Sequence, residues 1–187
     1  MTAPRLPKAT AMAHQLIRER LTLGDWAIDA TVGNGHDTQF LANCVGEAGV
    51  VIGFDIQTAA ISNASERLAD CPQVSLHQAD HSQLANYVQF PVSAIMFNLG
   101  YLPSGNKTII TQSQSTIPAL ESCIPLLKPN GIITIAIYTG HEGGIAESHA
   151  VEKWAVSLPQ SRFTVAKYQF LNQVNTPPYL IAIERKP

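Results

Sequence analysis

Short apolar runs alternate with stretches of helical periodicity along most of the chain, and this alternation limits the fold more than any other feature. The runs are WAIDAT, VVIGFDI, QVSLHQA, SAIMFNL and GIITIAIY, and the helix-like stretches between them cover 37–46, 57–70, 81–88 and 113–127. Strands that are apolar almost without interruption are buried on both faces, as in a parallel sheet whose crossovers are helices. The order therefore predicts an α/β, doubly wound fold with helices on both faces of a mostly parallel sheet.

The two ends of the chain depart from this alternation. Residues 8–22 carry apolar side chains at helical spacing and predict an amphipathic leading helix within 1–24. After a further predicted helix at 145–158, the segments FTVAKYQFL and PYLIAIER are separated only by NQVNTPP. That connection is too short for a helical crossover, so the two segments are predicted to pair in an antiparallel hairpin.

Composition limits the class of protein. With 187 residues and 45% hydrophobic content, the chain can bury one substantial core, so we expect a single domain over 1–187. No apolar run reaches the roughly 18 residues that cross a bilayer, and the charged first twenty residues do not resemble a signal peptide, which predicts a soluble, cytoplasmic protein. Three widely spaced cysteines suggest neither a disulfide framework nor a zinc site.

The junctions between strands and loops are the candidate ligand site, because an open parallel sheet binds ligands beyond the carboxyl ends of its strands. In the first junction, DATVGNGHDT, Gly33 and Gly35 allow a close approach of the backbone to a ligand, ahead of a helix N-terminus. Asp55 follows Gly35 by twenty residues, where a carboxylate can accept hydrogen bonds from a ribose diol. Asp80 suits either a ligand contact or a helix N-cap. We therefore expect an adenosine-containing ligand.

Three classes of nucleotide site compete for this pattern. A dinucleotide fingerprint read from Gly33 would have Thr38 in place of its third glycine, which is a poor match. A P-loop reading of GYLPSGNKT fails because its lysine comes one position too late for a phosphate cradle. DATVGNG instead resembles the first motif of class I methyltransferases that use S-adenosylmethionine (SAM), with Thr31 in place of the first glycine.

The whole chain resembles a specific family, the small tRNA 5-(aminomethyl)-2-thiouridine methyltransferases of the MnmM type, long catalogued among rRNA methylases. The resemblance rests on DATVGNGHDTQFLA, GFDIQ, FNLGYLPSGNK, YTGHEGG and NQVNTPPYLIAIE. It implies a Rossmann-like fold with seven strands and SAM as the cofactor. It also implies methyl transfer to the exocyclic amine of 5-aminomethyl-2-thiouridine at the tRNA wobble position, giving 5-methylaminomethyl-2-thiouridine.

The resemblance also implies three groups of site residues. The cofactor-binding group is Asp29, Thr31, Gly33, Asn34, Gly35, Asp37, Thr38, Asp55, Gln57, Asp80, His81 and Asn98. The substrate-binding group is Gly100, Lys107, Tyr138, Asn172 and Asn175. The catalytic group is Asn98, Tyr101 and His141. In this interpretation Asp29 faces the methionine ammonium group of SAM, and the glycines pass under the cofactor.

The predicted catalytic residues suit the alignment of an amine with an activated methyl group. The side-chain oxygen of Asn98 can accept a hydrogen bond from the amine, and Tyr101 can stack on the base or lie near the sulfonium. NLGY is similar to the N-P-P-Y tetrad of amino-methyltransferases, although Leu99 and Gly100 replace both prolines. His141 suits a base, a tRNA-phosphate contact or a helix cap. No metal is expected, because His77 and His81, which are four residues apart, straddle a strand end and do not share one helix face.

Charge leaves the partner open. The formal net charge of −2 gives no overall attraction to RNA, but Arg5, Lys8, Arg18 and Arg20 cluster near the start of the chain. If they lie with Lys107 on the face of the Asn98 loop, they favour the anticodon arm of a tRNA as partner. The alternatives are methylation of rRNA or of a small molecule, and a regulator that binds SAM without catalysis. A homodimer is expected because one small domain offers little surface for an anticodon arm.

Overall fold

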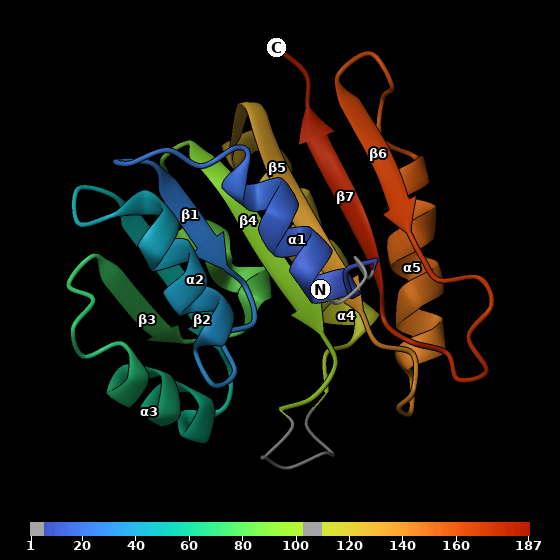
Figure 1. Cartoon of the computed structure of the whole chain (residues 1–187), viewed down its shortest axis with the longest axis horizontal. Coiled ribbons are helices and arrows are strands. Elements are labelled where there is room, and N and C mark those ends of the chain that lie inside the picture. The colour runs from blue at the N-terminus through green and yellow to red at the C-terminus, as the bar shows by residue number, and fades with distance from the viewer. Residues whose placement is uncertain (1–5, 103–109) are drawn as a thin grey trace, which may run out of the picture.

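The computed structural model describes residues 6–102 and 110–187. One seven-stranded sheet runs through these residues in the order β3-β2-β1-β4-β5-β7-β6 (Figure 1). Its strands are β1 (Trp26–Asp29), β2 (Val50–Asp55), β3 (Val74–Gln78), β4 (Val92–Leu99), β5 (Leu127–Ile137), β6 (Phe163–Tyr168) and β7 (Tyr179–Arg185). Strands β1 to β5 pair in parallel, whereas β7 is antiparallel to both β5 and β6. The predicted mixed sheet is confirmed.

Helices cover both faces of the sheet. They are α1 (Ala9–Arg18), α2 (His36–Val45), α3 (Thr58–Arg67), the 3-10 helix η1 (His81–Asn86), α4 (Ser113–Leu126) and α5 (Gly144–Val156). Successive residues of β4 point to opposite layers: Ile95 and Phe97 pack in the layer that includes α4 and α5, and Ala94 and Met96 in the layer that includes α1 and α2. A strand buried on both faces is the reason that these runs are continuously apolar.

Most elements differ from their predicted ranges by a few residues, and three of these differences have a local cause or change the element. The leading helix ends at Arg18 rather than near residue 22, because the N–H groups of Arg20 and Leu21 both bond to the carbonyl of Ile17 and close a turn. The stretch 81–88 forms only the short helix η1, started by the Asp80 side chain, which accepts a hydrogen bond from the Ser82 N–H. Strand β5 begins at residue 127, four residues earlier than its apolar run.

The carboxyl ends of the parallel strands meet at one edge of the sheet, at the bottom of Figure 1. Helix α1 has its N-terminal end toward this edge, because His14 reaches Asp37 in the first turn of α2. Beyond the other end of the helix, Arg20 bonds to Glu184, which pairs with Ile132 of β5. Lys8 and Arg20 of the predicted basic cluster thus lie toward opposite edges of the sheet, and Arg5 lies outside the described residues. No helix within the described residues is long and apolar enough to span a membrane.

Candidate functional site

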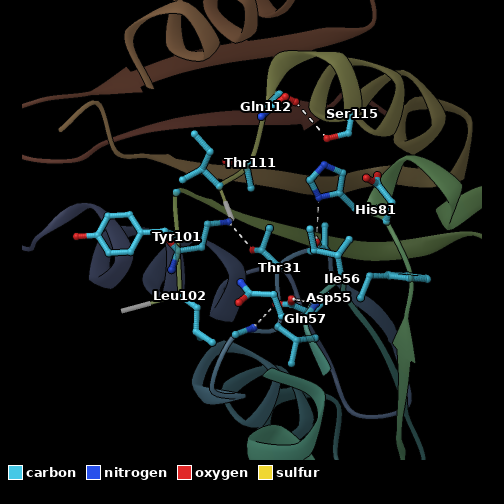
Figure 2. A pocket seen from close by; sticks show the side chains of 18 of the residues that line it. Thr31, Asp55, Ile56, Gln57, His81, Tyr101, Leu102, Thr111, Gln112 and Ser115 are labelled. Carbon is cyan, nitrogen blue, oxygen red and sulfur yellow. Dashed lines mark hydrogen bonds between the residues drawn. The ribbon is translucent and has the colours of Figure 1, made fainter. Parts of the chain in front are cut away.

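A cavity of about 750 Å³ opens at the carboxyl edge of the sheet. It is lined by residues after β1 to β5 and by the segment that leads into α4: Ala30, Thr31, Val32, Gly33, Asn34, His36, Asp37, Phe54, Asp55, Ile56, Gln57, Ala79, Asp80, His81, Ser82, Asn98, Gly100, Tyr101, Leu102, Ile110, Thr111, Gln112, Gln114, Ser115 and Tyr138. Figure 2 shows Asp55 and Gln57 on one side of the cavity and Gln112 and Ser115 on the opposite side. This volume is within the range of small-molecule sites.

Asp55 is held rigidly at the tip of β2. Its Oδ2 accepts a hydrogen bond of 2.9 Å from the Gly33 N–H, and its Oδ1 accepts one of 2.9 Å from the Gln57 N–H. Gly33 has φ +51°, in the left-handed region, which brings its N–H to the carboxylate. Each carboxylate oxygen can accept more than one hydrogen bond, so Asp55 can still bind a diol in the cavity.

The residues that follow β3 are partly used by the fold. His81 is 8% exposed, and its Nδ1 donates a hydrogen bond of 3.2 Å to the carbonyl of Ala30. Burial lowers the pKa of His81, so its ring is neutral near pH 7. Asp80 lines the cavity and also caps η1. Both of the roles considered for Asp80 are therefore compatible with its position.

Asp29 and Thr38 lie behind the cavity wall. Asp29 is 1% exposed; its Oδ2 accepts a hydrogen bond of 2.6 Å from the Thr38 hydroxyl, and its Oδ1 accepts one of 3.1 Å from the Thr31 N–H. Burial, aided by the charge of Asp37, raises the pKa of Asp29 to about 7. The geometry thus differs from the expectation that Asp29 faces a ligand ammonium: Asp37, and not Asp29, lines the cavity.

Gly35 also serves the fold rather than the cavity wall. Its φ is +78°, and a Cβ atom added there would lie 3.0 Å from the Cβ and 3.1 Å from the Cα of Ala64 in α3. The residue is therefore a glycine because α3 packs directly against this turn. Asn34 and His36 on either side of it line the cavity.

Asn98 is oriented by two hydrogen bonds, to Thr31 after β1 and to Asp37 in α2. Its N–H donates to the hydroxyl oxygen of Thr31 at 2.7 Å, and its Nδ2 donates to Oδ2 of Asp37 at 3.2 Å. Asp37 Oδ1 in turn lies 2.7 Å from Nε2 of His14, whose ring is stacked on Phe40 with centroids 3.9 Å apart. Because Nδ2 faces a carboxylate, Oδ1 is the atom that Asn98 can offer to an amine.

The remaining predicted residues are divided between the cavity and its surroundings. Gly100, Tyr101 and Tyr138 line the cavity, but Figure 2 shows the ring of Tyr101 pointing away from Asp55 and His81. Burial, aided by the charge of Asp37, raises the pKa of Tyr138.

His141 does not line the cavity. Its ring meets the edge of the Tyr101 ring at 6.1 Å, and its Nδ1 donates to the carbonyl of Glu142. Asn172 and Asn175 are exposed in the loop between β6 and β7, outside the cavity lining. Lys107 lies outside the described residues. Within the described ranges no group of three or more His, Cys, Asp or Glu residues could hold a metal ion.

Sequence reasoning missed His14 and the segment before α4. Residues 110–115 contain no motif, and they reach the cavity because Tyr101 and Ile110 pair as an antiparallel bridge. Thr111 is then fixed by its hydroxyl, which donates to Glu147 of α5 at 2.8 Å.

Comparison with known proteins agrees with this geometry. The family described as "Putative rRNA methylase" matches residues 51–184. The chain belongs to this family. It is 38% identical to the chloroplastic tRNA (mnm(5)s(2)U34)-methyltransferase of Arabidopsis thaliana, covering 96% of this chain and 70% of that relative. The predicted methyltransferase class and family are thus confirmed.

Two solved structures resemble this protein over nearly their whole length. A protein of Clostridium thermocellum, solved under the same family description, is 42% identical with a TM-score of 0.95, and the match covers 97% of this chain and 100% of that one. A methyltransferase-like protein of Streptococcus mutans in complex with SAH is 37% identical with a TM-score of 0.90, covering 97% and 99% of the two chains. The seven-stranded class I fold of the methylase is shared by both.

Proposed function

We propose that the protein transfers a methyl group from SAM to the exocyclic amine of 5-aminomethyl-2-thiouridine at the wobble position of tRNA. The product is 5-methylaminomethyl-2-thiouridine. The observation that carries this proposal is the fixed Asn98 amide, whose Oδ1 is available to an amine beside the Asp37 carboxylate in the cavity wall. The name of the Arabidopsis relative, which is 38% identical, gives the same modification.

The cofactor is SAM, because the Streptococcus mutans relative at 37% identity was solved with SAH, the demethylated form of SAM. The described residues fit such a group. Asp55, held by two backbone N–H groups, is placed for the ribose hydroxyls, and Gly33 brings the backbone close to the ligand. Asp80, His81 and Ser82 form the wall at the end of β3 where the adenine would lie. SAM supplies a methyl group that is already activated by the sulfonium.

The protein's own contribution is placement. Asn98 Oδ1 accepts a hydrogen bond from the amine and directs the nitrogen lone pair toward the methyl carbon. Tyr138 and Leu102 also line the cavity. Good alignment of two reactants can supply a large part of the rate enhancement without an acid or a nucleophile, since it replaces a bimolecular step by a unimolecular one.

The described basic residues support the tRNA substrate only weakly. Lys8 precedes α1 at the carboxyl edge, but Arg18 lies over the Phe40 ring and Arg20 is paired with Glu184 at the opposite edge. Contacts of Tyr101, His141, Gly100, Lys107, Asn172 and Asn175 with substrate stay predictions. The cytoplasmic location and the homodimer also stay predictions.

Nucleoside mass spectrometry tests the proposal. Purified protein and SAM are incubated with tRNA from cells that lack the modification, and separately with rRNA from the same cells. The expected result is a methyl group on 5-aminomethyl-2-thiouridine of tRNA and none on rRNA. Methylation of rRNA alone, or no methylation of tRNA by protein that binds SAM in a calorimeter, would contradict the proposal.

A further inference from the structure

We propose that Asp37 takes the proton from the aminomethyl ammonium group of the substrate, and that His14 is a positioning residue that holds Asp37 against Asn98 for this step. The inference rests on the proposed function and adds the proton acceptor that this reaction requires. An alkyl amine is largely protonated near neutral pH, and a protonated nitrogen has no lone pair to attack a methyl group.

The geometry places three side chains in one row that ends at the cavity. His14 Nε2 lies 2.7 Å from Asp37 Oδ1, and Asp37 Oδ2 lies 3.2 Å from Asn98 Nδ2. Asp37 and Asn98 line the cavity, whereas His14 lies behind them on α1. The His14 ring is fixed by its parallel stacking on Phe40, with an interplanar angle of 6°. A carboxylate is thus held next to the amide oxygen that is placed to receive the amine.

The charges around Asp37 favour this role. Asp29, behind it in β1, has its pKa raised to about 7 by burial and by the charge of Asp37. Tyr138, which also lines the cavity, has its pKa raised by burial and by the charge of Asp37. Asp55 lies on β2, where its oxygens are bonded to backbone N–H groups. Of these neighbours, His14 is the group that faces Asp37 as a hydrogen-bond donor from another helix. Among the carboxylates that line the cavity, Asp37 is the one that is hydrogen-bonded to the Asn98 amide.

The step balances in atoms and electrons. An N–H bond of the ammonium breaks and an O–H bond forms on Asp37. The freed lone pair then forms the N–C bond to the methyl group, and the S–C bond breaks with its electron pair remaining on sulfur. The product is a secondary ammonium group and SAH, and Asp37 returns its proton to water through its partly exposed side chain, which has 14% of its surface accessible.

The test is the pH dependence of kcat for full-length protein with saturating SAM and a tRNA carrying 5-aminomethyl-2-thiouridine. For Asp37→Asn we expect kcat near pH 7 to fall about 100-fold, in the range of a lost proton acceptor, and to recover as rising pH deprotonates the amine in solution. SAH affinity is measured by calorimetry beside kcat, because Asp37 is also one of the predicted cofactor-binding residues and a loss of affinity alone would assign it to the cofactor. Glu47→Gln, at an exposed site in the α2–β2 connection, is the matched control and should match the wild-type profile.

A pair of variants tests His14. His14→Phe retains an aromatic ring to stack on Phe40 but lacks the hydrogen bond, so kcat should fall about tenfold, the equivalent of one hydrogen bond to a charged group. His14→Gln restores a donor and should recover part of the loss, which a purely structural role of the ring would not produce. His149→Gln, on the exposed side of α5, is the matched histidine control.

Three results would overturn the inference. One is a pH dependence of kcat for Asp37→Asn that runs parallel to that of the wild type. Another is lost SAH affinity with unchanged kcat at saturating SAM, which would assign Asp37 to the cofactor. If Asp37→Asn does not fold, equal kcat values for His14→Phe and His14→Gln decide against the inference. The product formed by the wild-type protein separates this inference from the proposed function. If the wild-type protein methylates the amine and the Asp37 and His14 variants have the same kcat and pH profile as the wild type, the proposed function stands and only this inference fails.

Discussion

Replacing Asp29 by Asn gives a quantitative test of the electrostatics behind the cavity. Asp29 is 1% exposed, and burial together with the charge of Asp37 raises its pKa from 3.8 to about 7. An Asn side chain has the same shape and carries no charge. Its Oδ1 can still accept the hydrogen bond of the Thr31 N–H, and its Nδ2 can donate to the hydroxyl oxygen of Thr38.

The sign of the effect follows from proton binding. Below pH 3.8 both the folded and the unfolded chain hold the Asp29 proton, so this group costs no stability there. Above that pH the unfolded chain loses the proton first, so the free energy of unfolding falls as pH rises and becomes level above about pH 7. A pKa difference of about 3 corresponds to about 4 kcal/mol. In Asp29→Asn this fall is absent.

Urea denaturation followed by tryptophan fluorescence at several pH values measures the effect. Between about pH 4 and pH 8, the free energy of unfolding of Asp29→Asn should gain up to about 4 kcal/mol relative to the wild type. Carboxylates that do not interact with Asp29 titrate alike in both proteins, so they cancel in the difference. Glu47→Gln, at an exposed site, should show no such gain. Parallel curves for Asp29→Asn and wild type would refute the assignment of a raised pKa to Asp29.

Three further substitutions test other parts of the site. Gly35→Ala should lower the free energy of unfolding by about 1 to 3 kcal/mol, because its Cβ would meet Ala64 at 3.0 Å with φ at +78°; a wild-type urea midpoint would contradict this packing. Asp55→Asn should weaken SAH binding at least about tenfold in calorimetry, since a charged acceptor for the ribose is lost; unchanged affinity would remove Asp55 from the cofactor site. Asn98→Ala should lower kcat about 100-fold while SAH affinity is retained, and loss of SAH affinity alone would assign Asn98 to the cofactor.

The sheet could be predicted because its signal is local. Each strand is a separate apolar run, and the short NQVNTPP connection requires β6 and β7 to pair antiparallel. The position of β7 between β5 and β6 could not be read in the same way, because strand order depends on contacts between distant segments. Helix ends were also less certain than helix positions, as the end of α1 at Arg18 illustrates.

The site was predictable where spacing along the chain carries the information. Gly33 and Asp55 were found from a motif and a separation, and the structure joins them by a hydrogen bond. The motif does not say which carboxylate faces the cavity, because that depends on how β1 turns into α2; Asp29 turns inward and Asp37 lines the wall. His14 had no signal, since it reaches Asp37 only through the packing of α1 across the sheet.

A structure of the protein with SAH and an anticodon stem–loop containing 5-aminomethyl-2-thiouridine tests the central claim most directly. The quantity to measure is the distance from the exocyclic amine nitrogen to Asn98 Oδ1. We expect a hydrogen bond of about 2.7–3.2 Å, with the nitrogen directed toward the sulfur of SAH and Asp37 beside it. An amine bound against Gln112 and Ser115, on the side of the cavity opposite Asp55 and Gln57, would contradict this placement.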